Sequence, residues 1–184
     1  MMLGSFGGLA FQRSIYSLEV PPLKGYVNDL AELLPDDYAA DLEERLRHFE
    51  EKTGDRILVL AVTNVEGEDV KDFTRKVFKD WQDRALTKRY PARLRNPPRI
   101  AVVVIVKNEK KIGIESTRPL QPIVTDPAII RRVERPVANY LGGYRPDLGV
   151  ESGLQFLAKR INNDYPLGLP AKQSSCVRRL RCVP

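Results

Sequence analysis

The sequence predicts an α/β fold, in which a sheet with a parallel βαβ core gains an antiparallel hairpin strand. Two continuous apolar runs, Ile57–Val62 and Ile100–Val106, are typical of central strands that are covered on both faces. Between them, apolar residues recur at helical spacing. A strand, a helix and a strand of these lengths form a βαβ unit, so we expect the two strands to lie side by side and parallel.

The first helix is predicted over residues 36–52. One apolar stripe recurs there at spacings of four, four and three residues: Tyr38, Leu42, Leu46 and Phe49. Pro35 and the two acids after it suit the first turn, and Gly54 suits the C-cap. His48 lies at the edge of the stripe, so we expect a partly buried structural side chain rather than a catalytic base.

A second helix and a hairpin complete the predicted core. The helix begins at about Glu68, and its apolar stripe consists of Val70, Phe73, Val77 and Trp81. The proline-rich loop 88–99, which holds five bases and no acid, then leads into the second apolar run. A polar turn at 107–110 follows that run, and residues 111–117 are predicted to return as its antiparallel partner.

Two more helices are predicted after the hairpin. Asp126 and Pro127 suit the N-cap and the first position of one helix. Its apolar stripe consists of Ile129, Ile130, Val133, Val137 and Tyr140. Pro136 lies inside this helix, and we expect it to kink or split the helix. The last helix is predicted from about Pro146 to Ile161, with a stripe of Val150, Leu154, Leu157 and Ile161.

Length and composition predict one domain with a tail at each end. The chain has 184 residues, and we assign 1–24 to an extended leader, 25–162 to the domain and 163–184 to a flexible basic tail. The formal net charge is +6, but the bases concentrate in loop 88–99 and in the tail, which leaves a slightly acidic remainder. This distribution disfavours a nucleic-acid-binding face.

Two function classes are disfavoured by simple counts. No apolar run reaches the roughly 18 residues that a membrane span needs. Cys176 and Cys182 are the only cysteines, and with a single histidine they cannot readily complete a four-ligand zinc site. A disulfide and two free thiols both stay open for this pair.

Four stretches, in this order, resemble the TPM domain family. They are Val27–Leu34 before the first helix, Lys52–Ile57 before the first buried strand, Glu68–Phe73 at the start of the helix that Trp81 closes, and Gly143–Val150 at the last helix. The resemblance covers roughly residues 25–162. It implies an α/β sandwich with a central sheet, so the combined prediction is a three-layer α/β/α sandwich with a central mixed sheet.

Family membership would also imply an extracytoplasmic location, usually beside a membrane anchor. Some members have acid phosphatase activity or bind calcium, an ion that needs six to eight oxygen ligands. The acids expected near the strand ends, where α/β sheets bind ligands, are Asp29, Glu115, Asp126 and Asp147. Two of them also have a structural interpretation, Asp29 as a turn former and Asp126 as a helix N-cap.

The chain departs from the family at two polar landmarks. Where members commonly have Asp-Asn-Gly before the second core strand, this chain has Arg95-Asn96-Pro97, and the family's glycine-rich turn with a glutamate is Thr117–Pro122 here. These exchanges remove negative charge and add arginines, which suit phosphate or carboxylate. The sequence therefore predicts an anion site, with a merely solvated loop as the alternative, at Arg93, Arg95, Arg99 and Arg118.

Two main classes of function stay open. The first is a non-catalytic interaction module that acts in membrane-protein assembly or maintenance, with a diverged metal site. The alternative is an acid phosphatase-type phosphomonoesterase, with or without calcium, although no base is recognisable beside Ser116 or Thr117. A third interpretation, contact of the basic tail with anionic lipid, depends on four bases alone.

Overall fold

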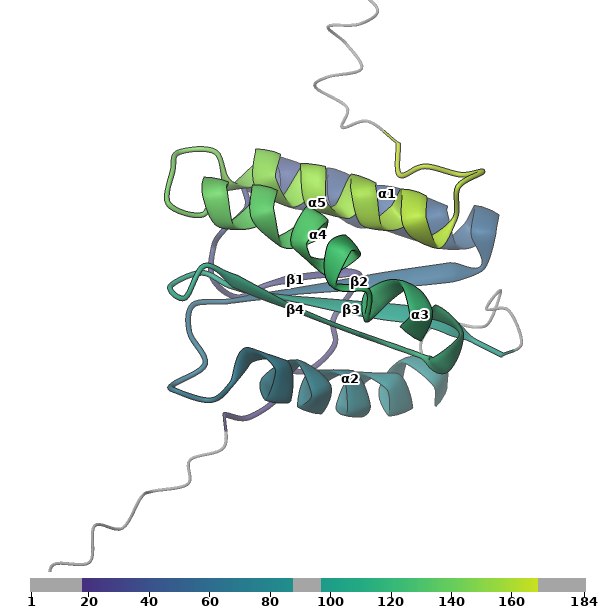
Figure 1. Cartoon of the computed structure of the whole chain (residues 1–184), viewed down its shortest axis with the longest axis horizontal. Coiled ribbons are helices and arrows are strands. Elements are labelled where there is room, and N and C mark those ends of the chain that lie inside the picture. Colours follow the sequence, from purple (N-terminus) through teal and green to yellow (C-terminus); the bar gives the residue numbers. More distant parts are fainter. Residues whose placement is uncertain (1–17, 88–96, 169–184) are drawn as a thin grey trace, which may run out of the picture.

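The computed structural model describes residues 18–87 and 97–168 and arranges them in three layers (Figure 1). A sheet lies between α2 (Val70–Thr87) on one face and α1 (Asp36–Thr53), α4 (Pro127–Tyr140) and α5 (Pro146–Ile161) on the other. A 3-10 helix (Arg118–Leu120) and the short α3 (Gln121–Val124) join the last strand to α4. The predicted three-layer α/β/α sandwich is therefore confirmed.

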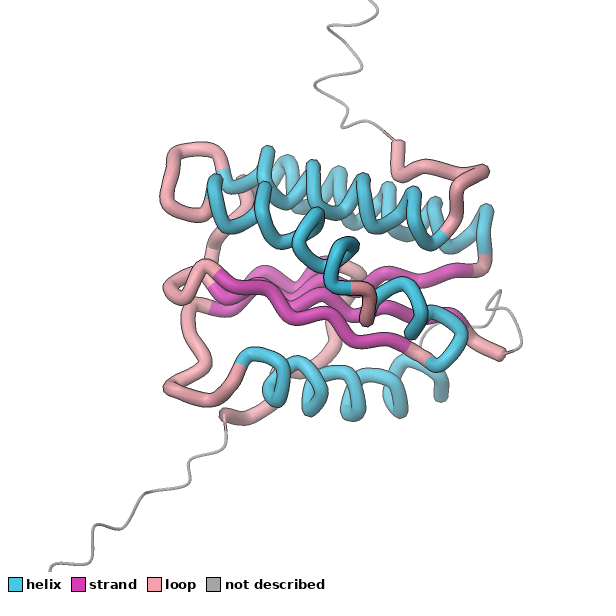
Figure 2. The backbone as a smooth tube through the Cα atoms, in the orientation of Figure 1, coloured by secondary structure: helices cyan, strands magenta, loops and turns pink. Residues whose placement is uncertain are grey.

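The sheet of the described residues contains four strands in the order β1-β2-β3-β4 (Figure 2). They are β1 (Val27–Asp29), β2 (Asp55–Val62), β3 (Arg99–Val106) and β4 (Lys111–Ser116). β2 and β3 pair in parallel over their whole length, and β4 returns antiparallel to β3. The parallel core and the hairpin strand are thus confirmed. β1 pairs in parallel with β2, and no hydrophobic pattern predicts it.

The central strands are buried because helices cover both faces of the sheet. Every residue of β2 is buried, and so is every residue of β3 after Arg99. Helix ends also agree with the sequence: Gly54 has φ 71° and donates its N–H to Glu50 O at 2.7 Å. His48 is more exposed than expected, since 49% of its side chain meets solvent.

Helix α4 continues through Pro136, so the expected split does not occur. The helix packs closely on α5. A methyl group built at Gly149 would lie 2.7 Å from the Pro136 carbonyl oxygen, and one at Gly153 would lie 3.0 Å from the Val133 carbonyl oxygen. The two glycines, one helical turn apart, therefore let the α4 backbone approach α5.

A charged network joins α1 to α5. Arg45 donates from Nη2 to Glu151 Oε2 at 2.9 Å and from Nη1 to Oε1 at 3.0 Å, and the Tyr38 hydroxyl donates to Oε2 at 2.6 Å. Burial raises the pKa of Glu151, but the hydrogen bonds from Arg45 and Tyr38 outweigh burial, so the pKa lies below its ordinary value. Burial and the bond to Glu151 raise the pKa of Tyr38, which therefore remains a donor.

The network predicts an acid-dependent stability. The folded protein holds the Glu151 carboxylate ionised more strongly than the unfolded chain does, so this stabilisation is complete above the ordinary glutamate pKa of about 4.3. It is lost as the pH falls through the lower pKa of the folded state. We expect Glu151→Gln to flatten the fall in unfolding free energy below about pH 5, measured by urea titration, and Tyr38→Phe to flatten it partly. If the unfolding free energy of Glu151→Gln fell with pH as steeply as that of the wild type, the Glu151 carboxylate could not be the source of this stabilisation.

Candidate functional site

Asp29, the first predicted calcium ligand, is engaged by backbone amides. It ends β1, and its carboxylate accepts hydrogen bonds from the N–H groups of Ala31 (3.1 Å), Leu33 (2.8 Å) and Leu34 (2.7 Å). The neighbouring Asn28 donates to the carbonyl oxygen of Gly25 at 2.9 Å. Asp29 therefore holds the turn between β1 and α1, and Asn28 holds the segment before β1.

The other three predicted calcium ligands lie elsewhere. Asp126 Oδ1 accepts from the Ala128 N–H at 2.7 Å as the N-cap of α4. Asp147 pairs with Arg145 at 2.9 Å, and the hydrogen bond from Arg145 lowers the pKa of Asp147. Glu115 belongs to β4, where it pairs with Val102 of β3, whereas Asp29 belongs to β1, where it pairs with Ala61 of β2. Glu115 and Asp29 thus lie on opposite edge strands of the sheet.

Within residues 18–87 and 97–168, no three His, Cys, Asp or Glu side chains form a group that could hold a metal ion. A groove of about 690 Å³ beside Asp29 is nonetheless acidic, since Glu32, Asp36 and Glu43 also line it. The Glu43 carboxylate in turn accepts the backbone N–H groups of Tyr26 (3.0 Å) and Val27 (2.6 Å). The calcium site remains an untested prediction, and the structure does not bring its four predicted residues together.

The predicted anion site is described only in part. Arg99 donates from Nε to the buried Asp55 at 2.6 Å and from Nη2 to the Ile161 carbonyl oxygen at 3.0 Å. It therefore ties the start of β3 to the end of α5. Arg118 is exposed at the start of the 3-10 helix. Arg93 and Arg95 lie outside the described residues.

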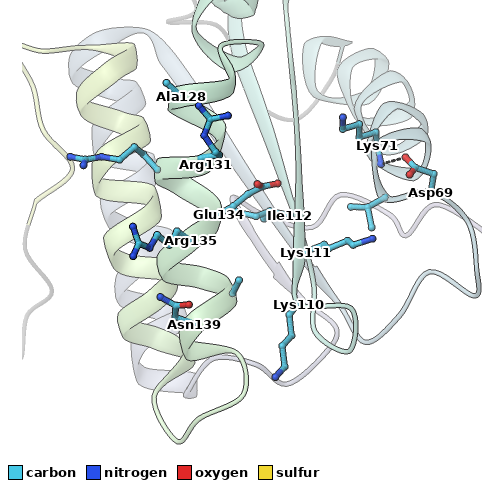
Figure 3. Close-up of a pocket in the computed structure, with 13 residues that line it drawn as sticks. Asp69, Lys71, Lys110, Lys111, Ile112, Ala128, Arg131, Glu134, Arg135 and Asn139 are labelled. Atoms are coloured by element: carbon cyan, nitrogen blue, oxygen red, sulfur yellow. Dashed lines mark hydrogen bonds between the residues drawn. The ribbon is translucent and has the colours of Figure 1, made fainter.

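A charged groove follows the free side of β4 (Figure 3). It measures about 840 Å³ and lies between the start of α2 and the length of α4. Its basic lining residues come from three elements and the hairpin turn: Lys71, Lys110, Lys111, Arg131, Arg132 and Arg135. In Figure 3, Lys111 points toward α2, and Glu134 points from α4 toward β4. We call this site the β4 groove.

The lining of the β4 groove contains six basic and two acidic side chains. Asp69 Oδ1 accepts from the Lys71 N–H at 2.8 Å. Burial raises the pKa of Glu134, although the nearby charge of Lys71 opposes this. The Arg132 guanidinium lies over the Phe156 ring of α5, 5.3 Å from its centre. The bases therefore outnumber the acids along this groove.

The β4 groove combines charged side chains with an apolar floor. Its described lining contains no hydroxyl, thiol or imidazole side chain, and its carboxylates and lysines are the groups of a type that can act as a base or a nucleophile. Ile112 and two alanines supply an apolar floor between the charges. Such a lining suits an anionic ligand with an apolar component.

The sequence carries a signal for this groove, but a weak one. Arg131 and Arg135 are four residues apart on one helical face, and Lys110 and Lys111 adjoin in the predicted hairpin turn. Neither pair predicts the other, because only the packing of α4 beside β4 brings them together. The prediction of the anion site in loop 88–99 therefore missed the β4 groove.

The fold and groove define a three-layer α/β domain with a cationic groove beside the edge strand of its sheet. The TPM domain model matches residues 27–160, so the chain belongs to the TPM domain family. No curated protein matches the chain significantly. No helix among the described residues is long and apolar enough to span a membrane.

Three solved structures share this fold. The N-terminal domain of a protein from P. gingivalis has a TM-score of 0.61 and 15% identity, over 78% of this chain and 87% of that one. The BA42 protein from the psychrophilic Bizionia argentinensis has a TM-score of 0.52 and 15% identity, over 76% and 88%. The N-terminal domain of the cg2496 protein from Corynebacterium glutamicum has a TM-score of 0.51 and 12% identity, over 85% and 91%. At these identities the likeness supports the fold alone.

Proposed function

We propose that the chain is a non-catalytic interaction module that acts on membrane proteins, in their assembly or maintenance. The observation that carries this proposal is the β4 groove, which gathers six basic side chains and an apolar floor. A partner with complementary negative charge would be steered to such a surface. An extracytoplasmic location, as the family resemblance implies, belongs to the same proposal.

Capture from a detergent extract of the source membranes tests this function. The full chain is compared with the groove variant Lys111→Glu/Arg131→Glu, which reverses one exposed charge on each wall. The control Lys52→Glu/Lys79→Glu makes the same charge change at exposed sites outside the groove. We expect the wild type and the control to retain the same integral membrane protein and the groove variant to lose it. Equal retention by both variants would contradict the proposal.

A phosphatase is the second candidate, because the full name of the matched family, TPM phosphatase, contains that activity and a cationic groove would also hold a phosphomonoester. Turnover of p-nitrophenyl phosphate at acidic pH, with and without calcium, tests it. Turnover that disappears in Lys111→Glu/Arg131→Glu but persists in the control would favour the enzyme. Absence of turnover above background in both conditions would remove this candidate.

A further inference from the structure

The strand β4 forms one edge of the sheet. Among the described residues it pairs with β3 on one side, and no strand lies on its other side. An edge strand of six residues presents a row of backbone donors and acceptors, which natural proteins usually cover or protect with charge. Here the edge opens into the β4 groove, of which Lys111 and Ile112 form part.

The register identifies which backbone groups face the groove. Thr117 donates its N–H to the Ile100 carbonyl oxygen at 2.9 Å, which makes this a hydrogen-bonded pair. Along an antiparallel strand such pairs alternate, so Gly113 also faces β3. The N–H and C=O groups of Ile112 and Ile114 consequently point away from β3. Ile112 lines the groove, and Ile114 lies two residues further along the same free edge.

The two helices flank this edge as walls. Gly113 allows α2 to pack closely, since a methyl group built there would lie 1.9 Å from Thr74 Oγ1. On the opposite face of the sheet, α4 presents Arg131 and Glu134 to the groove. A segment beside β4 would therefore have one set of alternate side chains near Lys111 and Lys71, and the other set near Arg131.

We propose that the β4 groove binds an extended, acidic segment of the partner protein, which adds to the sheet as a strand beside β4. The inference rests on the proposed interaction function and names the chemistry of its partner. Backbone hydrogen bonds to Ile112 and Ile114 supply register, and carboxylates on both faces of the added strand meet the cations of both walls. Charge complementarity selects this occupant, since a basic segment would be repelled.

Peptide binding to the full chain tests the inference. The probe is a fluorescein-labelled ten-residue peptide of glutamate and threonine, followed by fluorescence anisotropy at physiological salt. A second probe has the same sequence but N-methyl groups on four consecutive central residues, which removes donors from both edges of the peptide while its charge is kept. We expect the methylated peptide to bind at least about tenfold more weakly, and Lys111→Glu/Arg131→Glu to weaken the parent peptide at least about tenfold. The control Lys52→Glu/Lys79→Glu should stay within about twofold.

Amide hydrogen exchange gives a readout that electrostatic attraction alone would not change. The parent peptide should slow exchange at Ile112 and Ile114, whose N–H groups would become donors to it, and should affect Gly113 less. Equal binding of the two peptides with no new protection at Ile112 or Ile114 would overturn the strand-addition proposal. Membrane capture that depends on Lys111 and Arg131 would in that case still support the interaction function.

Three further outcomes distinguish the inference from the proposed function. Absence of binding by the parent peptide would overturn the inference. Phosphatidylglycerol vesicles that displace the peptide with the same dependence on Lys111 and Arg131 would assign the groove to a membrane surface and overturn it as well. In the third outcome, the peptide binds as expected while the groove variant and the control variant both retain the membrane protein as well as the wild type does. That result would contradict the interaction function instead of the inference.

Discussion

Glu50→Ala is expected to lower the free energy of unfolding by about 3–5 kcal/mol, because it leaves the Arg56 guanidinium charged and buried without its carboxylate. Only 1% of the Arg56 side chain and 8% of the Glu50 side chain meet solvent. Arg56 donates from Nε to Oε2 at 2.5 Å and from Nη2 to Oε1 at 2.6 Å. The Tyr26 hydroxyl donates to Oε2 at 2.9 Å, so one carboxylate of α1 joins β2 and the residue just before β1.

Two controls separate the buried pair from ordinary surface charge. Glu44→Ala removes a partner of Arg47 on the same helix, where both side chains are well exposed, and should leave the urea midpoint nearly unchanged. The double variant Glu50→Leu/Arg56→Met removes both charges and should recover much of the lost stability. Urea unfolding at pH 7, followed by circular dichroism, measures all three. An equal midpoint for Glu50→Ala and Glu44→Ala would contradict the expected penalty.

The helices and central strands could be predicted because their burial repeats within a short stretch of sequence. The apolar stripe of α5 indicates one buried helix face, and the apolar runs of β2 and β3 indicate strands buried on both faces. Neither signal depends on which element covers the buried face. β1 could not be predicted in this way. It has three residues, of which Asn28 and Asp29 are polar, and it is a strand because Val27 to Asp29 pair with distant residues of β2.

The predictions of calcium-binding acids and anion-binding arginines depend on residue type. Residue type does not reveal which protein groups each side chain will bind in the folded chain. Asp29 is satisfied by the backbone N–H groups of the turn that follows it, and Asp126 by the first turn of its own helix. Arg99 pairs with Asp55, which is 44 positions away along the chain. Competing partners of this kind become visible only when the chain is folded.

The β4 groove could not be predicted from the sequence, because its side chains come together only in the folded chain. Lys71, Lys111 and Arg131 belong to three separate elements, and each alone is an ordinary exposed base on an amphipathic element. The pairing of β4 with β3, followed by the turn back into α4, places them around one edge. A site formed by topology in this way has no spacing signature in the sequence.

Trp81→Ala is expected to cost about 3–5 kcal/mol of unfolding free energy, since it removes a fully buried indole from between α2 and the segment before β1. The Trp81 side chain is 0% exposed. Its Nε1 donates to the Pro21 carbonyl oxygen at 2.8 Å, and Leu18, Val20 and Leu23 pack against the same core. One substitution therefore leaves a cavity and also releases residues 18–24.

The matched control for Trp81 is Tyr144→Ala, which removes an aromatic ring that is 103% exposed and should leave stability unchanged. Trp81→Phe keeps a ring but loses the bond to Pro21, so its cost should lie between the other two. The urea titration must be monitored by circular dichroism rather than by tryptophan fluorescence, because Trp81 is the only tryptophan in the chain and two of the variants lack it. If Trp81→Ala and Tyr144→Ala shared one midpoint, the indole could not be buried as described. If Trp81→Ala were destabilised but protease cleavage near Pro21 did not increase, the indole would stabilise the sheet without holding the preceding segment.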